Sequence, residues 1–231
     1  MRPPGFVRSA VLIALKDLRL EWRTLESFSA GAIFSLIVLI VFNFAFDLGV
    51  VRELGADRLV PGVIWIALAF SSLVGLTRSF QFERQHGAMT ALFLAPIDRG
   101  AVFAGKAAAN VIKLGSLQLL VVPLSALFFD FDLTAIALPL LGVIVLHGIG
   151  LVELGTLFAG ITSRVGRGEA LLATLLFPAT CPLLISAVKT TAALLAGQSL
   201  AEHGHWLATA ATFDLLYLFV GLLTFEFVLE E

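Results

Sequence analysis

The chain has 231 residues, of which 59% are hydrophobic and only 14% are charged, and its mean hydropathy is +0.99. Soluble domains contain about 45–50% apolar and about 25% charged residues, so this composition excludes an ordinary soluble fold. The net charge of −2 argues against binding to nucleic acid. The single cysteine excludes an internal disulfide and cannot by itself form a zinc site.

Residues 6–26 have the pattern of an amphipathic helix. Apolar side chains recur every three or four residues, at Val11, Leu15, Leu18, Trp22 and Leu25. Most of the residues between them are polar, and several of those are basic. We expect this helix to lie in the inner membrane interface, and packing on a transmembrane bundle is a compatible alternative.

Six apolar stretches are long enough to cross a bilayer as helices, which takes about 20 residues each. They occupy residues 28–46, 61–77, 107–128, 135–161, 170–188 and 206–228. The connections between them are short, so we predict an all-α polytopic membrane protein with one transmembrane domain over residues 1–231.

The basic residues indicate the orientation of the six spans. With a cytoplasmic N-terminus, the inner segments hold eleven of the fifteen Lys and Arg residues. The outer loops hold three, namely Arg52, Arg58 and Lys189. Because cytoplasmic loops carry an excess of Lys and Arg, we predict that both termini are cytoplasmic.

A charged loop at 78–96 connects the second and third spans. After Glu83 and Arg84, Gly87 is followed by an apolar run that ends at Pro96. The residue before a proline avoids helical geometry, so the pattern predicts a short helix that stops there. Such a helix across the inner face would suit docking into a groove of a soluble partner, and a bare interfacial connector is the alternative.

Asp98 is placed to cap the helix that contains the third span. Residues 100–107, GAVFAGKA, match most of a phosphate-binding loop, but Ala107 replaces the Ser or Thr that binds magnesium, and no strand precedes the match. We interpret the match as coincidental. This chain is therefore not expected to hydrolyse ATP.

His147, Glu153 and Asp214 are ionisable residues at membrane depth. Each charge there costs roughly 2.5–3.5 kcal/mol, so each needs a partner or an aqueous cavity. His147 and Glu153 are six residues apart and do not share a helix face. A transport route and structural hydrogen bonding both remain open for the two carboxyl groups, whereas a packing role is expected for His147.

Glycine and proline mark the fourth and fifth spans. The fourth contains Gly142, Gly148, Gly150, Gly155 and Gly160, which allow neighbouring helices to approach closely. Pro178 and Pro182 lie one turn apart in the fifth span and predict a kink or a break. No protease motif occurs, and we expect neither a catalytic site nor a metal site.

The loop resembles the coupling helix of exporter permeases of the ATP-binding-cassette class. The matching pattern is ER-x-x-G-x-x-x-x-L-x-x-x-P, at Glu83, Arg84, Gly87, Leu92 and Pro96. Nearly the whole chain is similar, in order, to the CcmB family, the haem exporter permeases of the cytochrome c maturation system. The segments are LKDLRLEWRTLESFSAGAIFSLIVLIVFNFAFD, LAPIDRGAVFAGKAAAN, GTLFAGITSR, LLFPATCPLLISAVKTTAALL and FDLLYLFVGLLTFEFVLEE.

The resemblance implies an ABC-2-type exporter permease in the bacterial inner membrane. A separate CcmA-like ATPase would bind the coupling helix, beside a CcmC-like haem-handling protein and a small CcmD-like accessory protein. The complex would serve haem export or the release of a haem-loaded chaperone. Only Trp22, Trp65 and Trp206 occur, all isolated, so we expect a mechanical role or transient haem contact rather than a stably bound cofactor.

Two other functions remain as alternatives. A generic exporter permease of the same class would move a lipid, a glycan or a drug, and copurifying proteins would distinguish it. A secondary transporter would use protons through Glu153 or Asp214 and have no ATPase partner. The absence of an internal sequence repeat and the presence of the coupling-like loop argue against the second alternative.

Overall fold

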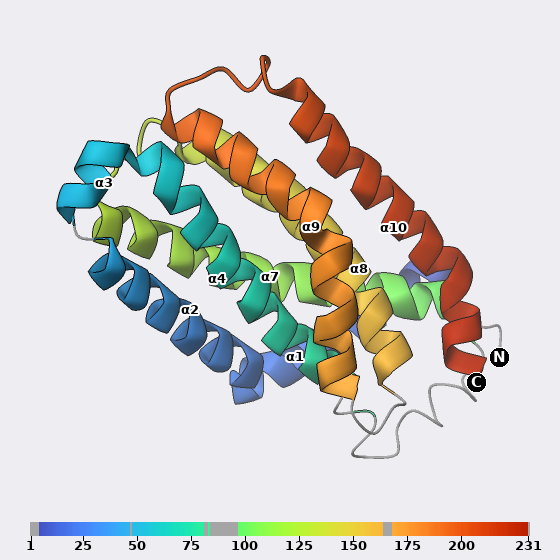
Figure 1. The fold of residues 1–231 in the computed structure, drawn as a ribbon. Coiled ribbons are helices and arrows are strands. Elements are labelled where there is room, and N and C mark those ends of the chain that lie inside the picture. The colour runs from blue at the N-terminus through green and yellow to red at the C-terminus, as the bar shows by residue number, and fades with distance from the viewer. Residues whose placement is uncertain (1–4, 47, 81–82, 84–96, 164–167, 231) are drawn as a thin grey trace.

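The computed structural model describes residues 5–46, 48–80, 83, 97–163 and 168–230, and all regular structure in this part of the chain is helical. Figure 1 shows the arrangement of these helices. They are α1 (Phe6–Thr24), α2 (Glu26–Ala45), α3 (Leu48–Leu54), α4 (Ala56–Ser79), α7 (Arg99–Phe129), α8 (Ala137–Thr162), α9 (Gly168–Leu195) and α10 (Gly204–Glu230).

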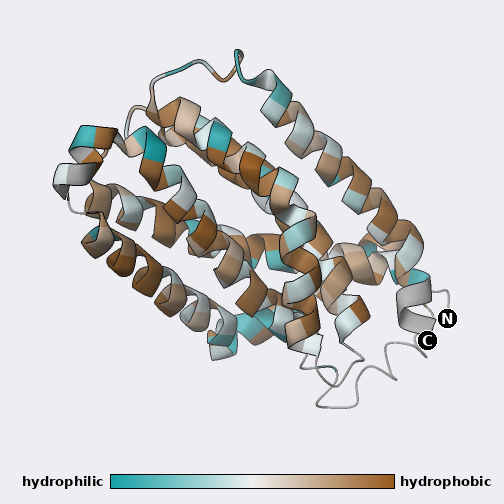
Figure 2. Cartoon of the chain, viewed as in Figure 1, coloured by the Kyte–Doolittle hydropathy of each residue, from teal (hydrophilic) through white to brown (hydrophobic). Residues whose placement is uncertain are grey.

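The six predicted spans are confirmed as α2, α4, α7, α8, α9 and α10, each long and apolar enough to cross a membrane. Figure 2 shows hydrophobic residues along the lengths of these helices and more polar residues towards the ends of the bundle. The start of α1 and the end of α10 lie at the same end of the bundle, as the prediction for the termini requires (Figure 1).

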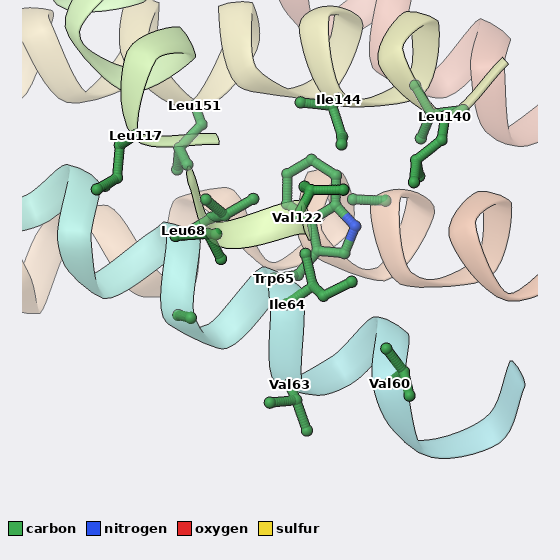
Figure 3. Close-up of a cluster of buried hydrophobic side chains, with 14 of the residues drawn as sticks. Val60, Val63, Ile64, Trp65, Leu68, Leu117, Val122, Leu140, Ile144 and Leu151 are labelled. Atoms are coloured by element: carbon green, nitrogen blue, oxygen red, sulfur yellow. The ribbon is translucent and has the colours of Figure 1, made fainter. Parts of the chain in front are cut away.

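Helices α4 and α8 form the centre of the bundle, and α2 and α10 lie at its sides. Of the most apolar window of each helix, 61% of α4 and 56% of α8 is buried, against 17% of α2 and 11% of α10. The core surrounds Trp65 of α4, which packs among side chains of α7 and α8 (Figure 3). Its indole N–H donates to Thr191 Oγ1 of α9 at 2.9 Å, so the buried polar atom is satisfied.

The amphipathic helix predicted at 6–26 is α1, and the structure shows the alternative interpretation of its position, packing on the bundle. Its buried residues, Ser9, Ile13 and Asp17, pack against α7. The apolar side chains of Val11, Leu15 and Trp22 are exposed, so the interfacial position stays a compatible prediction.

The predicted third span began at residue 107, but α7 begins at Arg99 and contains 31 residues. At 1.5 Å per residue it is about 46 Å long, more than the roughly 30 Å of hydrocarbon in a bilayer. The excess lies at its start, alongside α1. Asp98 caps this start as predicted, because its Oδ1 accepts a hydrogen bond from the backbone N–H of Gly100 at 2.8 Å.

A kink or a break was predicted at Pro178 and Pro182. Helix α9 continues through both prolines, so the break does not occur. The ribbon of α9 does change direction partway along (Figure 1), as a proline kink would. The helix stays continuous because the preceding residues keep their helical bonds, and the hydroxyl of Thr180 adds a bond to the carbonyl of Leu176 at 2.9 Å.

The close packing predicted for the glycines of α8 is confirmed at three positions. A β-carbon at Gly148 would contact Gln118 of α7, and one at Gly155 would collide with Leu76 of α4. A β-carbon at Gly150 would collide with Asp214 of α10. Gly142 is different, because a β-carbon at that position would have no atom within 4 Å.

Candidate functional site

A buried ion-pair cluster joins the end of α4 to α1 and α7. Its centre is Lys106 of α7, whose side chain has no exposed surface. The ammonium group of Lys106 donates to Glu83 Oε1 at 2.9 Å, to Asp17 Oδ2 at 3.1 Å and to the backbone carbonyl of Ser79 at 2.6 Å. It also lies 4.5 Å from the centre of the Phe80 ring.

Lys16 of α1 completes this cluster from its solvent-facing side. Its ammonium group pairs with Asp17 Oδ1 at 2.9 Å and with Glu83 Oε1. We define the joint cluster as Lys16, Asp17, Glu83 and Lys106. Two cations face two carboxylates, so its formal charge is balanced.

The pKa values of Glu83 and Lys16 reflect this pairing. Burial alone would raise the pKa of Glu83, but the nearby charges of Lys106 and Lys16 hold that pKa below its ordinary value. Burial alone would lower the pKa of Lys16, but Asp17 and Glu83 together raise it above its ordinary value. Both groups are therefore charged at neutral pH.

Further hydrogen bonds extend from the joint cluster towards the bundle centre. Asn110, one turn after Lys106, donates to Ser79 Oγ of α4 and to Thr156 Oγ1 of α8, each at 3.1 Å. Because Lys106 also donates to the backbone carbonyl of Ser79, hydrogen bonds connect the joint cluster to three of the six spans, counting α7 itself.

The packing at the start of α7 accounts for the glycines and the lysine that produce the phosphate-loop match. Gly105 lies against α1, where a β-carbon would sit 2.6 Å from the carbonyl oxygen of Ala10 and 2.8 Å from Ile13 Cβ. A β-carbon at Gly100 would lie 3.2 Å from the carbonyl oxygen of Leu222 in α10. Two glycines and the lysine serve helix packing and charge pairing, consistent with interpreting the match as coincidental.

The predicted coupling segment lies mostly outside the described residues: Arg84, Gly87, Leu92 and Pro96 belong to residues 84–96, of which the structure describes nothing. Glu83 is described, and its carboxylate is turned inwards to Lys106 and Lys16. Glu83 therefore pairs with α1 and α7 at the start of the predicted coupling pattern. The sequence analysis placed Lys106 on the cytoplasmic side but did not predict its ion pairs. The only signal for them was the position of Lys106 itself, a charged residue one turn before Asn110 in an apolar helix.

Glu153 and Asp214, predicted at membrane depth, lie close together between α8 and α10. Glu153 is 6% exposed, and its carboxyl group interacts electrostatically with that of Asp214. Gly150 permits the approach, because a side chain there would collide with Asp214 Oδ1. We call these two groups the carboxyl pair.

His147 lies apart from the carboxyl pair, as the helix periodicity predicted. It is fully buried, and its Nδ1 donates to the carbonyl of Val143 at 2.8 Å. Its Nε2 lies 2.9 Å from Ser186 Oγ of α9, and its ring lies 5.6 Å from that of Trp65. Both nitrogens are engaged, so the geometry favours a packing role. Pro178 and Pro182 lie on α9, which contributes Leu183 beside Gly150.

Known proteins similar to this chain share one description. A family model described as "CcmB protein" matches residues 8–229. The chain is 35% identical to "Heme exporter protein B" of Escherichia coli K12 over 171 residues, which cover 74% of this chain and 76% of that protein. It is 32% identical to the protein of that name from Paracoccus denitrificans, over 75% and 78% of the two chains. The relative from Pseudomonas aeruginosa is 29% identical over 86% and 87%.

The match extends over both clusters and all six spans, from α1 to the last turn of α10. The chain therefore belongs to the CcmB protein family of multi-pass membrane proteins.

Proposed function

We propose that this chain is the membrane-spanning permease of a haem exporter in cytochrome c maturation. Membership of the CcmB family and relatives named heme exporter protein B support the cargo. They favour haem over the lipid, glycan or drug of a generic exporter.

We further propose that a separate cytoplasmic ATPase drives this permease through the segment that follows Glu83. The observation that carries this proposal is the joint cluster. A charge buried with its partners resists separation, since breaking one buried pair costs about 3–5 kcal/mol. Movement of the segment after Glu83 would therefore pull on Lys106 of α7 and Asp17 of α1 rather than be absorbed locally.

The hydrogen bonds of Asn110 provide the next step of this route. Through Ser79 and Thr156 they connect α7 with α4 and α8, the two most buried helices. In our proposal the resulting shift changes the packing of α8 against α9 and α10. It would either move haem or release a haem-loaded chaperone on the far side of the bacterial inner membrane.

Copurification tests the assignment of partners. The tagged chain would be extracted gently from native membranes and its companions identified by mass spectrometry. We expect a CcmA-like ATPase, a CcmC-like haem-handling protein and a small CcmD-like protein. An ATPase alone would indicate a generic exporter, and the absence of any ATPase would contradict the proposed coupling.

Two variants test the route itself. Glu83→Gln keeps the shape of the side chain but removes its charge, and Gly87→Trp places bulk in the predicted coupling helix. We expect both to insert normally but to uncouple ATP hydrolysis from cytochrome c formation. Glu53→Gln, at an exposed position on α3, is the matched control and should behave as wild type. Normal cytochrome c levels in both test variants would refute the route.

A further inference from the structure

Two carboxyl groups at membrane depth, those of the buried Glu153 and the half-buried Asp214, lack complete partners. Glu153 is in the interior of α8, and its Oε2 is buried without a hydrogen-bond partner. The Oδ1 atom of Asp214 in α10 is also buried without a hydrogen-bond partner. Buried polar atoms in proteins are nearly always hydrogen-bonded, so two such atoms on interacting groups require an explanation.

The packing around the carboxyl pair makes it a weakly polar site. Gly150 has no side chain, which lets Asp214 reach the backbone of α8. A β-carbon at Gly150 would lie 3.1 Å from Leu183 Cδ2 of α9, so an apolar side chain covers the same spot. The site thus offers carboxyl oxygens, helix backbone and hydrocarbon.

The charged groups of the surrounding helices do not neutralise the carboxyl pair. On α7, Lys106 is held by the joint cluster and Lys113 lies 3.9 Å from Glu21. On α8, His147 bonds towards α9 and its own backbone. The described cation of α9, Lys189, is six residues from the outer end of that helix, and α4 has charges only at its two ends. On α10, Tyr217 packs edge-on against Phe213.

We propose that Glu153 and Asp214 form a cation-binding site that holds one proton between them. One carboxyl group is protonated and donates to the other, so the pair has one negative charge and its unpartnered oxygens acquire a bond. Two ionised carboxylates that interact in a low-dielectric site repel each other, which favours retention of the proton. A sodium ion is disfavoured, because the side chain that α9 places beside Gly150 is the apolar Leu183, which supplies no oxygen ligand.

This proton site does not depend on the proposed haem cargo. Helices α8 and α10 are held together here by a proton rather than by a fixed cation. The carboxyl pair can therefore release or accept charge when the packing of these two helices changes.

Dicyclohexylcarbodiimide tests the site, because it modifies protonated carboxyl groups in apolar surroundings. The full-length chain in native membranes would be treated from about pH 6 to about pH 9 and its peptides analysed by mass spectrometry. We expect an adduct at Glu153 or Asp214, falling about tenfold per pH unit once the proton is lost. Glu226, exposed near the end of α10, is the control carboxyl group and should remain unmodified.

Infrared spectroscopy of the purified protein provides a second measurement that does not depend on reagent access. We expect a carbonyl band of a protonated carboxyl group that shifts in D₂O and disappears in the double variant Glu153→Gln/Asp214→Asn. Each single variant should fold, because an amide can donate to the remaining carboxylate. Absence of this band at neutral pH would overturn the proposal, and so would protection of both residues from the reagent by sodium at constant pH.

Discussion

The joint cluster and the carboxyl pair are two buried charged sites that satisfy their charges in opposite ways. The joint cluster has two cations and two carboxylates with short contacts among all four groups. The carboxyl pair has two acids and no described cation. A balanced cluster resists change and is suited to transmit movement, whereas a pair of like groups depends on an exchangeable cation.

The largest expected effect comes from removing the central cation of the joint cluster. Lys106→Met leaves Asp17 and Glu83 buried, with only the half-exposed Lys16 as partner. We expect a loss of about 3–5 kcal/mol in the free energy of unfolding, because an uncompensated buried charge is costly. Thermal unfolding of the detergent-solubilised protein measures it.

Lys16→Met is the matched control, since its side chain is 46% exposed and the Lys106 contacts survive. Its loss should be much smaller. Equal losses in the two variants would mean that the cluster is not organised around Lys106.

Gly105→Ala separates the helices that carry the joint cluster. The new methyl group would collide with the backbone of Ala10 and with Ile13, so α1 must shift away from α7. We expect destabilisation of about 1–3 kcal/mol and increased proteolysis of α1. Gly115→Ala, on the same helix with nothing within 4 Å, should instead stabilise by about 0.5–1 kcal/mol. The comparison fails if both substitutions have the same sign.

The pH dependence of stability distinguishes the joint cluster from the rest of the protein. The pKa of Glu83 is lowered in the folded chain, so its contribution is present above its unfolded value, near 4.5, and is lost as pH falls through the lower folded value. The pKa of Lys16 is raised, so its contribution is full below its unfolded value, near 10.5, and is lost as pH rises through the higher folded value. Thermal midpoints below pH 5 should fall less steeply in Glu83→Gln than in wild type. Parallel curves would contradict this assignment.

The smallest expected change in stability comes from removing the cap at the start of α7. Asp98→Ala removes the side-chain cap from the backbone N–H of Gly100, and loss of such a cap costs about 1 kcal/mol. Asp98→Asn retains an acceptor and should lose less. Thermal unfolding checks the order, and an alanine variant as stable as wild type would show that packing against α1 alone holds this end.

Local patterns in the sequence predicted most of the fold. Apolar runs of about 20 residues need helical hydrogen bonding within each segment when no water is present, so the six spans follow from composition and length. The three-and-four spacing around Val11 and Leu15 predicted α1, and Asp98 predicted where α7 starts. These features depend on neighbours within a few turns of the same helix. Of the kink or break predicted at Pro178 and Pro182, the break does not occur, because the neighbouring helical bonds of α9 are enough to continue the helix.

The two sites were decided by the tertiary structure. Glu83 meets Lys16 across 67 positions of the sequence and Lys106 across 23, and Asp17 meets Lys106 across 89. Glu153 lies near Asp214 because Gly150 faces α10, whereas the sequence says only that both residues lie within membrane spans. The sequence by itself determined which segments are helices and which groups are costly to bury. Their partners were determined only when the helices packed, because helix rotation and contact depend on side chains that are distant along the chain.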